Sequence, residues 1–287
     1  MDSERITGTA HNANCELYFE TFGEPDHPAL LLINGLGSQS INYPDAWCEK
    51  FAAQGLFTIR FDNRDVGRSS KFDGAPLNER GACYDLSDMA ADAIAVLDAN
   101  GIGRAHVMGL SMGGMIAQTL AIEYPDRLLS MTSVMSSSGE DAFRKSTQNA
   151  TRLLTAPPPT DRESYIASWI EGLHEWGSPE FADEQRWRSD AEIAFDRSFH
   201  PAGAGRQYTA VATSSPRAEK LKSVVVPTLV IHGDRDNLIN QIAGQRVAEL
   251  IPGAKFAVIE GMGHDYPPQL WDRWVALVVD HIGTARP

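Results

Sequence analysis

A serine framed by glycines is the part of the sequence whose spacing points most directly to chemistry. Ser111 lies in Gly109-Leu110-Ser111-Met112-Gly113, which fits the pattern G-x-S-x-G. The pattern predicts a sharp turn from a strand into a helix, in which the serine is strained and its hydroxyl is exposed. A Cβ atom at position 109 or 113 would collide with neighbouring backbone in such a turn. The sequence therefore predicts Ser111 as a nucleophile, and the plain alternative is a tight turn with an incidental serine.

The predicted base is His264, because a serine hydroxyl is a poor nucleophile until a base takes its proton. His264 lies in Gly261-Met262-Gly263-His264, a glycine-rich loop after the last predicted strand. This loop would bring it to the same edge of the sheet as Ser111. His106 begins a predicted strand and His232 ends one, so we interpret both as structural.

The base needs an acceptor on its second ring nitrogen, which fixes the tautomer and stabilises the imidazolium. Asp236 follows a predicted strand in His232-Gly233-Asp234-Arg235-Asp236. The chain order serine, aspartate, histidine is the order found with this kind of serine turn. Asp234 lies closer to the strand end and remains an alternative. We favour Asp236 because the turn after Gly233 should carry it back over the edge of the sheet.

Two backbone N–H groups are candidates for stabilising a tetrahedral oxyanion. The first belongs to Met112, directly after the nucleophile, at the start of a helix. The second belongs to Leu36 in Asn34-Gly35-Leu36-Gly37, where glycines allow backbone to approach a substrate closely. Such donors contribute about 3–4 kcal/mol each to transition-state stabilisation. The plain alternative for residues 34–37 is a flexible turn, and neither phosphate-binding glycine pattern is completed.

Strand-like and helix-like segments alternate and would position these residues. Short apolar runs predict buried strands, and apolar positions at helical spacing predict the helices between them. The alternation predicts an α/β fold with a mostly parallel central sheet and helices on both faces. The predicted strands are 15–22, 29–33, 57–61, 105–110, 128–134, 227–232 and 256–259, and the predicted helices are 85–100, 112–124, 240–251 and 270–282.

The strand signal stops in the middle of the chain. We interpret residues 137–215 as a helical cap inserted into a core domain made of residues 1–136 and 216–287. The insertion is rich in aromatic residues, and Trp169, Trp176 and Trp187 are candidates for lining an apolar substrate pocket. The alternative is that they form the insertion's own core.

Composition narrows the partners and the compartment. The formal net charge of −13 disfavours binding to nucleic acid or to anionic membranes. The sequence contains no apolar stretch of about 18 residues, so we expect no membrane span. The N-terminus lacks the pattern of a secretory signal. Three cysteines, Cys15, Cys48 and Cys83, form no Cys-x-x-Cys pair and predict reduced thiols in the cytoplasm. We expect no cofactor and no metal, and either a monomer or a homodimer.

These motifs resemble those of the α/β-hydrolase superfamily along nearly the whole chain. Within it the chain is most similar to bacterial carboxylesterases and to the methylesterases that trim polyketide antibiotics such as aclacinomycin. Asn34 stands where the family commonly has histidine, and the turn at 62–69 is similar to a structural turn of the family. The resemblance rests on residues 34–37, 62–69, 109–113, the Asp236 turn and 261–264, in this order.

The resemblance implies the α/β-hydrolase fold with an inserted helical cap, and ester hydrolysis through an acyl-enzyme. We therefore predict a serine hydrolase, a carboxylesterase or methylesterase, that cleaves a carboxylic ester of a small, largely apolar molecule. A lactonase and a carbon–carbon bond hydrolase with the same triad are alternatives. A protein that binds a small ligand without turnover is an alternative of a different class. Dehalogenases and epoxide hydrolases require an aspartate where this chain has Ser111.

Overall fold

An eight-stranded sheet organises the fold in the computed structural model, which describes residues 5–143 and 145–285. The strand order is β1-β2-β4-β3-β5-β6-β7-β8. β1 and β2 are antiparallel to their neighbours, and the pairs from β4 to β8 are parallel, which confirms the predicted mostly parallel sheet. The strands are β1 (Ile6–Asn12), β2 (Cys15–Phe22), β3 (Ala29–Ile33), β4 (Phe57–Phe61), β5 (Ala105–Leu110), β6 (Leu128–Val134), β7 (Thr228–Gly233) and β8 (Lys255–Ile259).

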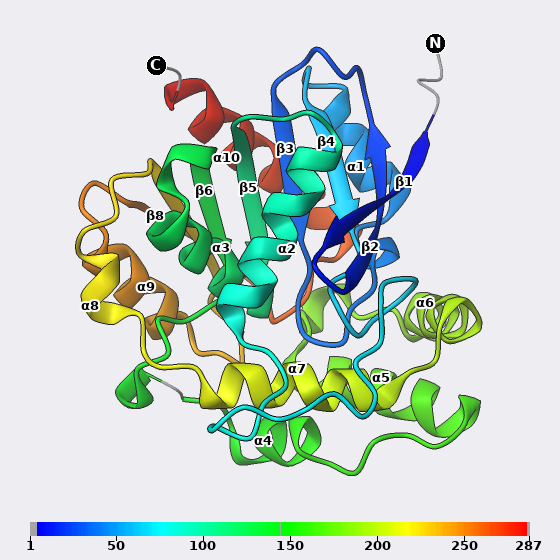
Figure 1. Cartoon of the computed structure of the whole chain (residues 1–287). Coiled ribbons are helices and arrows are strands. Elements are labelled where there is room, and N and C mark those ends of the chain that lie inside the picture. The colour runs from blue at the N-terminus through cyan, green and yellow to red at the C-terminus, as the bar shows by residue number, and fades with distance from the viewer. Residues whose placement is uncertain (1–4, 144, 286–287) are drawn as a thin grey trace.

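Helices cover both faces of the sheet (Figure 1). One face carries α2, α3 and α9, and the opposite face carries α1 and α10. Among the described helices, none combines the length and the apolar character that crossing a bilayer requires. The helices are α1 (Asp45–Ala52), α2 (Leu86–Ala99), α3 (Met112–Glu123), α4 (Gln148–Leu154), α5 (Arg162–Trp176), α6 (Glu184–Arg197), α7 (Pro201–Thr213), α8 (Ala218–Leu221), α9 (Gln241–Leu250) and α10 (Trp271–Thr284).

Local sequence explains where α2 begins and ends. The Asp85 side chain accepts hydrogen bonds from the backbone N–H groups of Ser87 and Asp88, which satisfies two of the free donors at the helix start. Gly101 follows the end of the helix with a φ of 69°, a conformation that favours glycine. The boundaries therefore agree with the predicted helix to within a residue at each end.

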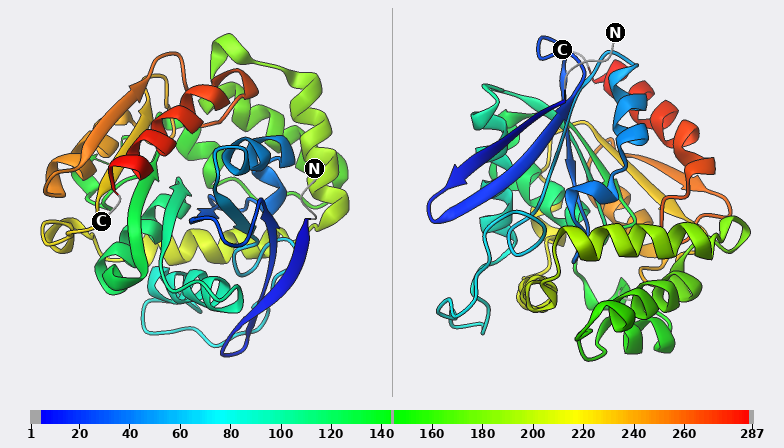
Figure 2. Two further views of the ribbon diagram at one scale, coloured as in Figure 1. Left: turned by 90° about the horizontal axis from the view of Figure 1, so that it is seen from above. Right: turned by 90° about the vertical axis from the view of Figure 1, so that its right-hand side faces the viewer.

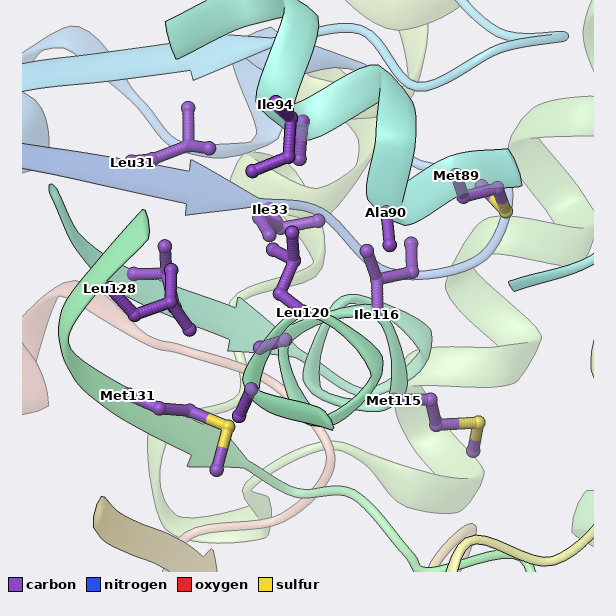
Figure 3. Close-up of a cluster of buried hydrophobic side chains, with 14 of the residues drawn as sticks. Leu31, Ile33, Met89, Ala90, Ile94, Met115, Ile116, Leu120, Leu128 and Met131 are labelled. Carbon is purple, nitrogen blue, oxygen red and sulfur yellow. The ribbon is translucent and has the colours of Figure 1, made fainter. Parts of the chain in front are cut away.

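The largest apolar cluster lies between α2, α3 and the central strands (Figure 3). Ile33 of β3 lies between Ile94 of α2 and the α3 residues Ile116 and Leu120, and Leu31 belongs to the same cluster. All five residues of β3 are buried, because helices cover the sheet on both sides. Each fully buried aliphatic side chain of this kind stabilises the fold by about 1.5–3 kcal/mol. This packing fixes the start of α3 against the end of β3.

The sequence prediction missed the edge strand β1. It pairs with β2 through a tight hairpin in which Ala13 has a φ of 52°. Gly8 has no side chain because the ring of Phe19 occupies the space where its Cβ would lie. Small and polar residues therefore fill β1, and the apolar alternation that marks a strand is weak there.

The long connection between β6 and β7 contains helices α4 to α8 in the part of it that the structure describes. Helices α4 to α7 lie beyond one end of the sheet, below it in Figure 1 and in the right-hand view of Figure 2. This is the end at which β3 leads into Asn34 and β5 leads into Ser111. The segment is thus placed to cover the residues that the sequence singles out for chemistry.

Replacing a core residue of β3 tests this packing. Leu31→Ala should lower the free energy of unfolding by about 2–5 kcal/mol, since Leu31 is fully buried and its removal leaves a cavity. Val225→Ala is the control, because Val225 is 84% exposed and its truncation should change stability by less than about 0.5 kcal/mol. Urea denaturation followed by circular dichroism measures both. Equal effects of the two substitutions would contradict the layered core.

Candidate active site

The turn between β5 and α3 holds Ser111 in a strained backbone conformation. Ser111 has φ 55° and ψ −115°, a region that side chains other than glycine rarely adopt. A Cβ at Gly109 would overlap the carbonyl of Gly113, and a Cβ at Gly113 would overlap the carbonyl of Ile33. The glycines therefore permit the close approach that the sequence pattern predicts, and the strain projects the hydroxyl from the turn.

His264 bridges Ser111 and Asp236. Its Nε2 lies 2.9 Å from Ser111 Oγ, and its Nδ1 lies 2.7 Å from Asp236 Oδ2. An ionised carboxylate can only accept hydrogen bonds, so Nδ1 carries the proton and Nε2 is free to accept from the Ser111 hydroxyl. The structure thus brings together the three residues predicted to act as nucleophile, base and acceptor.

Asp236 is held as a carboxylate in a buried position. Its Oδ1 accepts hydrogen bonds from the backbone N–H groups of Leu238 and Ile239, at 2.9 and 2.7 Å. Burial by itself would raise the pKa of Asp236, but the charges and hydrogen bonds of His264 and His232 outweigh burial and lower the pKa to about 2. The carboxylate is therefore ionised at neutral pH and can stabilise a protonated His264.

Asp234, the alternative acceptor, points elsewhere. It is exposed, and its Oδ1 accepts a hydrogen bond of 2.7 Å from the N–H of Gly261, at the start of the His264 loop. His232, interpreted from sequence as structural, contacts the candidate site directly. Its Nε2 lies 2.7 Å from the carbonyl oxygen of Ile239 and 3.2 Å from Asp236 Oδ2. Asp234 thus supports the loop, and His232 supports the carboxylate that faces His264.

The last residue of α5 and the chain that follows it hold the His264 loop in place, a contact that sequence reasoning missed. The N–H of His264 donates to the carbonyl of Trp176, and a Cβ at Gly263 would overlap the backbone of residues 176 and 177. Ser178 donates its hydroxyl to Asp265 and accepts from the N–H of Gly263 at 2.9 Å. Burial raises the pKa of Asp265. The local sequence signal for this close contact was Gly263, directly before His264.

The residues that carry the two predicted oxyanion donors line the same cavity as Ser111. Met112 is the first residue of α3, and an N–H in that position has no carbonyl partner within the helix. Gly35 precedes Leu36 and lies beside Ser111. A Cβ atom added to Gly35 would be 3.4 Å from the Cβ of Ser111. Asn34, which replaces the family's usual histidine, donates through Nδ2 to the carbonyl of Gln39 at 2.7 Å. The side chain of Asn34 therefore braces this loop.

The turn at 62–69 is a hydrogen-bonded support, as the resemblance implies. Asp62 accepts from the N–H of Ser40 at 2.6 Å and from the N–H of Arg68 at 2.8 Å. It also forms an ion pair of 2.7 Å with Arg197 of α6. Asp65 accepts from Tyr84 and from Arg206 of α7; burial opposes its ionisation, but these bonds outweigh burial and lower its pKa.

A cavity of about 1110 Å³ opens between this site and the helices beyond the sheet. Ser111, His264 and Leu36 line one side of it, and the three candidate tryptophans, Trp169, Trp176 and Trp187, line another. Trp187 is 2% exposed and packs edge-on against His174, so it is a core residue as well as a wall. The two readings of these aromatic residues are therefore compatible.

Metal ligation has no candidate cluster in residues 5–143 and 145–285. No group of three or more histidine, cysteine, aspartate or glutamate side chains there is arranged to hold an ion. The three cysteines are free thiols.

Comparisons with known proteins agree with this geometry. Residues 28–266 match the family described as alpha/beta hydrolase fold. The rhodomycin D methylesterase DauP of Streptomyces sp. (strain C5) is 31% identical over 94% of this chain and 95% of its own length. The 3-oxoadipate enol-lactonase 2 of Acinetobacter baylyi is 27% identical over 85% of each chain.

A solved structure has the same overall fold. The 2-hydroxy-6-oxo-6-phenylhexa-2,4-dienoate hydrolase of Rhodococcus sp. strain RHA1 superposes with a TM-score of 0.79. The alignment covers 98% of this chain and 99% of that chain at 18% identity, so the likeness concerns the fold alone.

The lowered pKa of Asp236 predicts a pH-dependent stability. Because the folded-state pKa of about 2 lies below the ordinary value of 3.8, ionised Asp236 stabilises the fold above about pH 4. This contribution of about 2 kcal/mol is lost as the pH falls, about 1 kcal/mol of it by pH 3. The stability gap between wild type and Asp236→Asn should therefore narrow from pH 5 to pH 3 in urea unfolding. Leu31→Ala, which removes no titrating group, should show a constant gap, and a constant gap for Asp236→Asn would contradict the assignment.

Proposed function

Since the chain belongs to the α/β-hydrolase family and its relatives are hydrolases, we propose that it hydrolyses carboxylic esters through an acyl-enzyme on Ser111. The observation that carries the proposal is the continuous hydrogen-bonded path from Asp236 through His264 to Ser111, with both distances below 3 Å. A serine in a strained turn, a base within hydrogen-bond reach and a carboxylate that orients the base are the parts that acyl transfer needs.

The first half-reaction transfers the acyl group to the enzyme. His264 Nε2 takes the proton of Ser111 as Oγ attacks the carbonyl carbon, and the carbonyl π electrons move to the oxygen. The oxyanion is stabilised by the N–H groups of Leu36 and Met112, and by the positive end of the α3 dipole. The intermediate then collapses, and His264 gives its proton to the departing alkoxide, which leaves as the alcohol.

The second half-reaction releases the acid. His264 takes a proton from a water molecule as the water attacks the acyl carbon. Collapse of this second intermediate breaks the bond to Ser111 Oγ, and His264 returns the proton to that oxygen. Asp236 stays ionised throughout, because its pKa of about 2 lies far below neutral pH.

The proposed substrate has a bulky, largely apolar portion. A cavity of about 1110 Å³ is slightly larger than the pockets that usually hold drug-sized ligands, so an acetate-sized acyl group would leave most of it unfilled. Three exposed apolar side chains on the cap helices, Leu154, Ile193 and Tyr208, also line it. The DauP relative is named a rhodomycin D methylesterase, and a methyl ester of a bulky, largely apolar acid fits these features.

A lactone is the second candidate substrate. The 27% identical relative is named an enol-lactonase, and a lactone is a cyclic ester that the same serine would open. The two candidates differ in the fate of the alcohol, which stays attached to the acid after lactone opening.

Removal of the nucleophile tests the proposed function. Ser111→Ala should abolish labelling by a fluorophosphonate probe and lower kcat for p-nitrophenyl butyrate by at least about 10⁴-fold, because no oxygen remains for acylation. Ser223→Ala, at an exposed serine, should label and turn over substrate like the wild type.

Each alternative has its own outcome in that assay. Labelling of the wild type with hydrolysis of lactones in a pH-stat, and no turnover of open-chain esters, would favour the lactonase. Full activity in Ser111→Ala would refute the acyl-enzyme. A folded wild type that binds apolar ligands, without labelling or turnover, would favour the binding protein.

The aromatic wall should contribute to chain-length preference. Trp169 lines the cavity, so Trp169→Ala removes apolar contact that a long acyl chain would make. We expect KM for p-nitrophenyl octanoate to rise about tenfold, while KM for the acetate changes little. Trp169→Phe is the matched control and should stay close to the wild type. An equal rise in KM for both esters would indicate that the bound acyl chain does not contact Trp169.

A further inference from the structure

Helix α7 packs against two loops at one end of the sheet, the loop after β3 and the turn after β4. Gly203 lies very close to Asp65 in the turn after β4. A Cβ atom added to Gly203 would overlap the backbone carbonyl oxygen of Asp65. One turn farther along the helix, Arg206 forms a two-point ion pair with the Asp65 carboxylate, at 2.9 and 2.7 Å. Ala204 faces the loop that follows β3. A Cβ atom added to Gly37 in that loop would lie 3.4 Å from the Cβ of Ala204. The helix is therefore fixed directly above the loop that follows β3.

Gln207 of α7 connects these two loops through its amide. Its Oε1 accepts a hydrogen bond of 2.7 Å from the N–H of Gly37, and its Nε2 donates at 2.8 Å to the carbonyl of Arg64. The side chain is fully buried. The residues of α7 that line the cavity are instead Tyr208, Val211 and Ala212. The amide thus contacts the backbone of both loops at a position apart from the substrate cavity.

The bond to Gly37 engages the central peptide of the turn that carries Leu36, the peptide between Leu36 and Gly37. Residues 35–38 form a turn closed by a hydrogen bond of 3.3 Å from the N–H of Ser38 to the carbonyl of Gly35. Gly37 has a φ of 71°, the positive value that a type II turn requires at its third residue. In a type I turn the peptide between Leu36 and Gly37 is rotated by about 180°, so the N–H of Gly37 would point away from Gln207.

We propose that Gln207 is a positioning residue for the oxyanion hole, which holds the Leu36 turn in its type II form from the cap helix α7. The inference rests on the proposed function, in which the N–H of Leu36 stabilises the oxyanion. Preorganised donors are effective because they are already aimed when charge develops, and a displacement of about 1 Å can cost about 10²-fold in rate. Gln39, the other glutamine that joins this loop to the cap, bonds to the carbonyls of Ala194 and Ser198 and lies beyond the turn.

The test compares variants that keep or remove the acceptor for the Gly37 N–H. Gln207→Met keeps the side-chain length without hydrogen bonds. Gln207→Asn shortens the arm by one methylene, so it cannot reach both loops, and it serves if Gln207→Met fails to fold. Gln207→Glu keeps the acceptor for Gly37 and loses the donor to Arg64. Gln118→Met is the matched control, since Gln118 is equally buried but bonds to Ser133 and Arg217.

Each variant is assayed with p-nitrophenyl butyrate and with the thionoester in which sulfur replaces the carbonyl oxygen. Sulfur is a weak hydrogen-bond acceptor, so the thionoester gains little from the oxyanion donors. The kcat for the oxygen ester divided by the kcat for the thionoester therefore reports how well the donors are aimed. We expect Gln207→Met and Gln207→Asn to lower kcat for the oxygen ester by about 10- to 100-fold with little change in KM, and to lower the ratio by a similar factor. Gln207→Glu should retain most of the ratio, and Gln118→Met should retain all of it.

Specific outcomes would overturn the inference. A folded Gln207→Met or Gln207→Asn with the wild-type kcat and ratio would show that the turn holds itself. Equal losses in Gln118→Met would show that only general stability had changed. Turnover by the wild type that survives Ser111→Ala would instead refute the proposed function, and this inference with it.

Discussion

Close contact between backbones at one end of the sheet is the constraint on which the rest of the structure depends. The chain leaves β5 and enters α3 within a single residue, which is possible because Gly109 and Gly113 have no side chains to collide with the backbone around them. Gly113 contacts the end of β3 directly, so the loop that follows β3 begins beside Ser111. One set of contacts therefore positions the serine hydroxyl, the start of α3 and the loop that carries Leu36.

Buried charges attach helices α6 and α7 to this end of the sheet. Asp62 and Asp65 are fully buried, and each forms an ion pair with an arginine of α6 or α7. A buried carboxylate without a partner is strongly destabilising, so these pairs disfavour arrangements in which either helix moves away. Such contacts are directional, unlike apolar packing, and they orient the helices whose other side chains line the cavity.

The carboxylate of Asp236 is shared by two histidines with different surroundings. His264 faces Ser111, and its loop is held by Asp234 on one side and by the segment after α5 on the other. His232 lies beneath, where its ring occupies the space that a side chain at Gly244 of α9 would need. Contacts from the loop after β7 and from the segment after α5 thus combine to set the orientation of one imidazole ring.

The sequence by itself determined the parts whose signals are local. The spacing around Ser111 and His264 and the apolar runs of the buried strands are properties of short segments, and the structure brings those segments together as predicted. The sequence favoured Asp236 over Asp234 without excluding Asp234, because the partners of the two carboxylates, the N–H of Gly261 and the ring of His264, lie on a distant loop. Gln207, Arg197 and Ser178 carried no signal, since they act on residues between 85 and 170 positions away in the chain. Only the tertiary structure decided these contacts, because they exist only once the helices after β6 have packed against the loops that follow β3, β4 and β8.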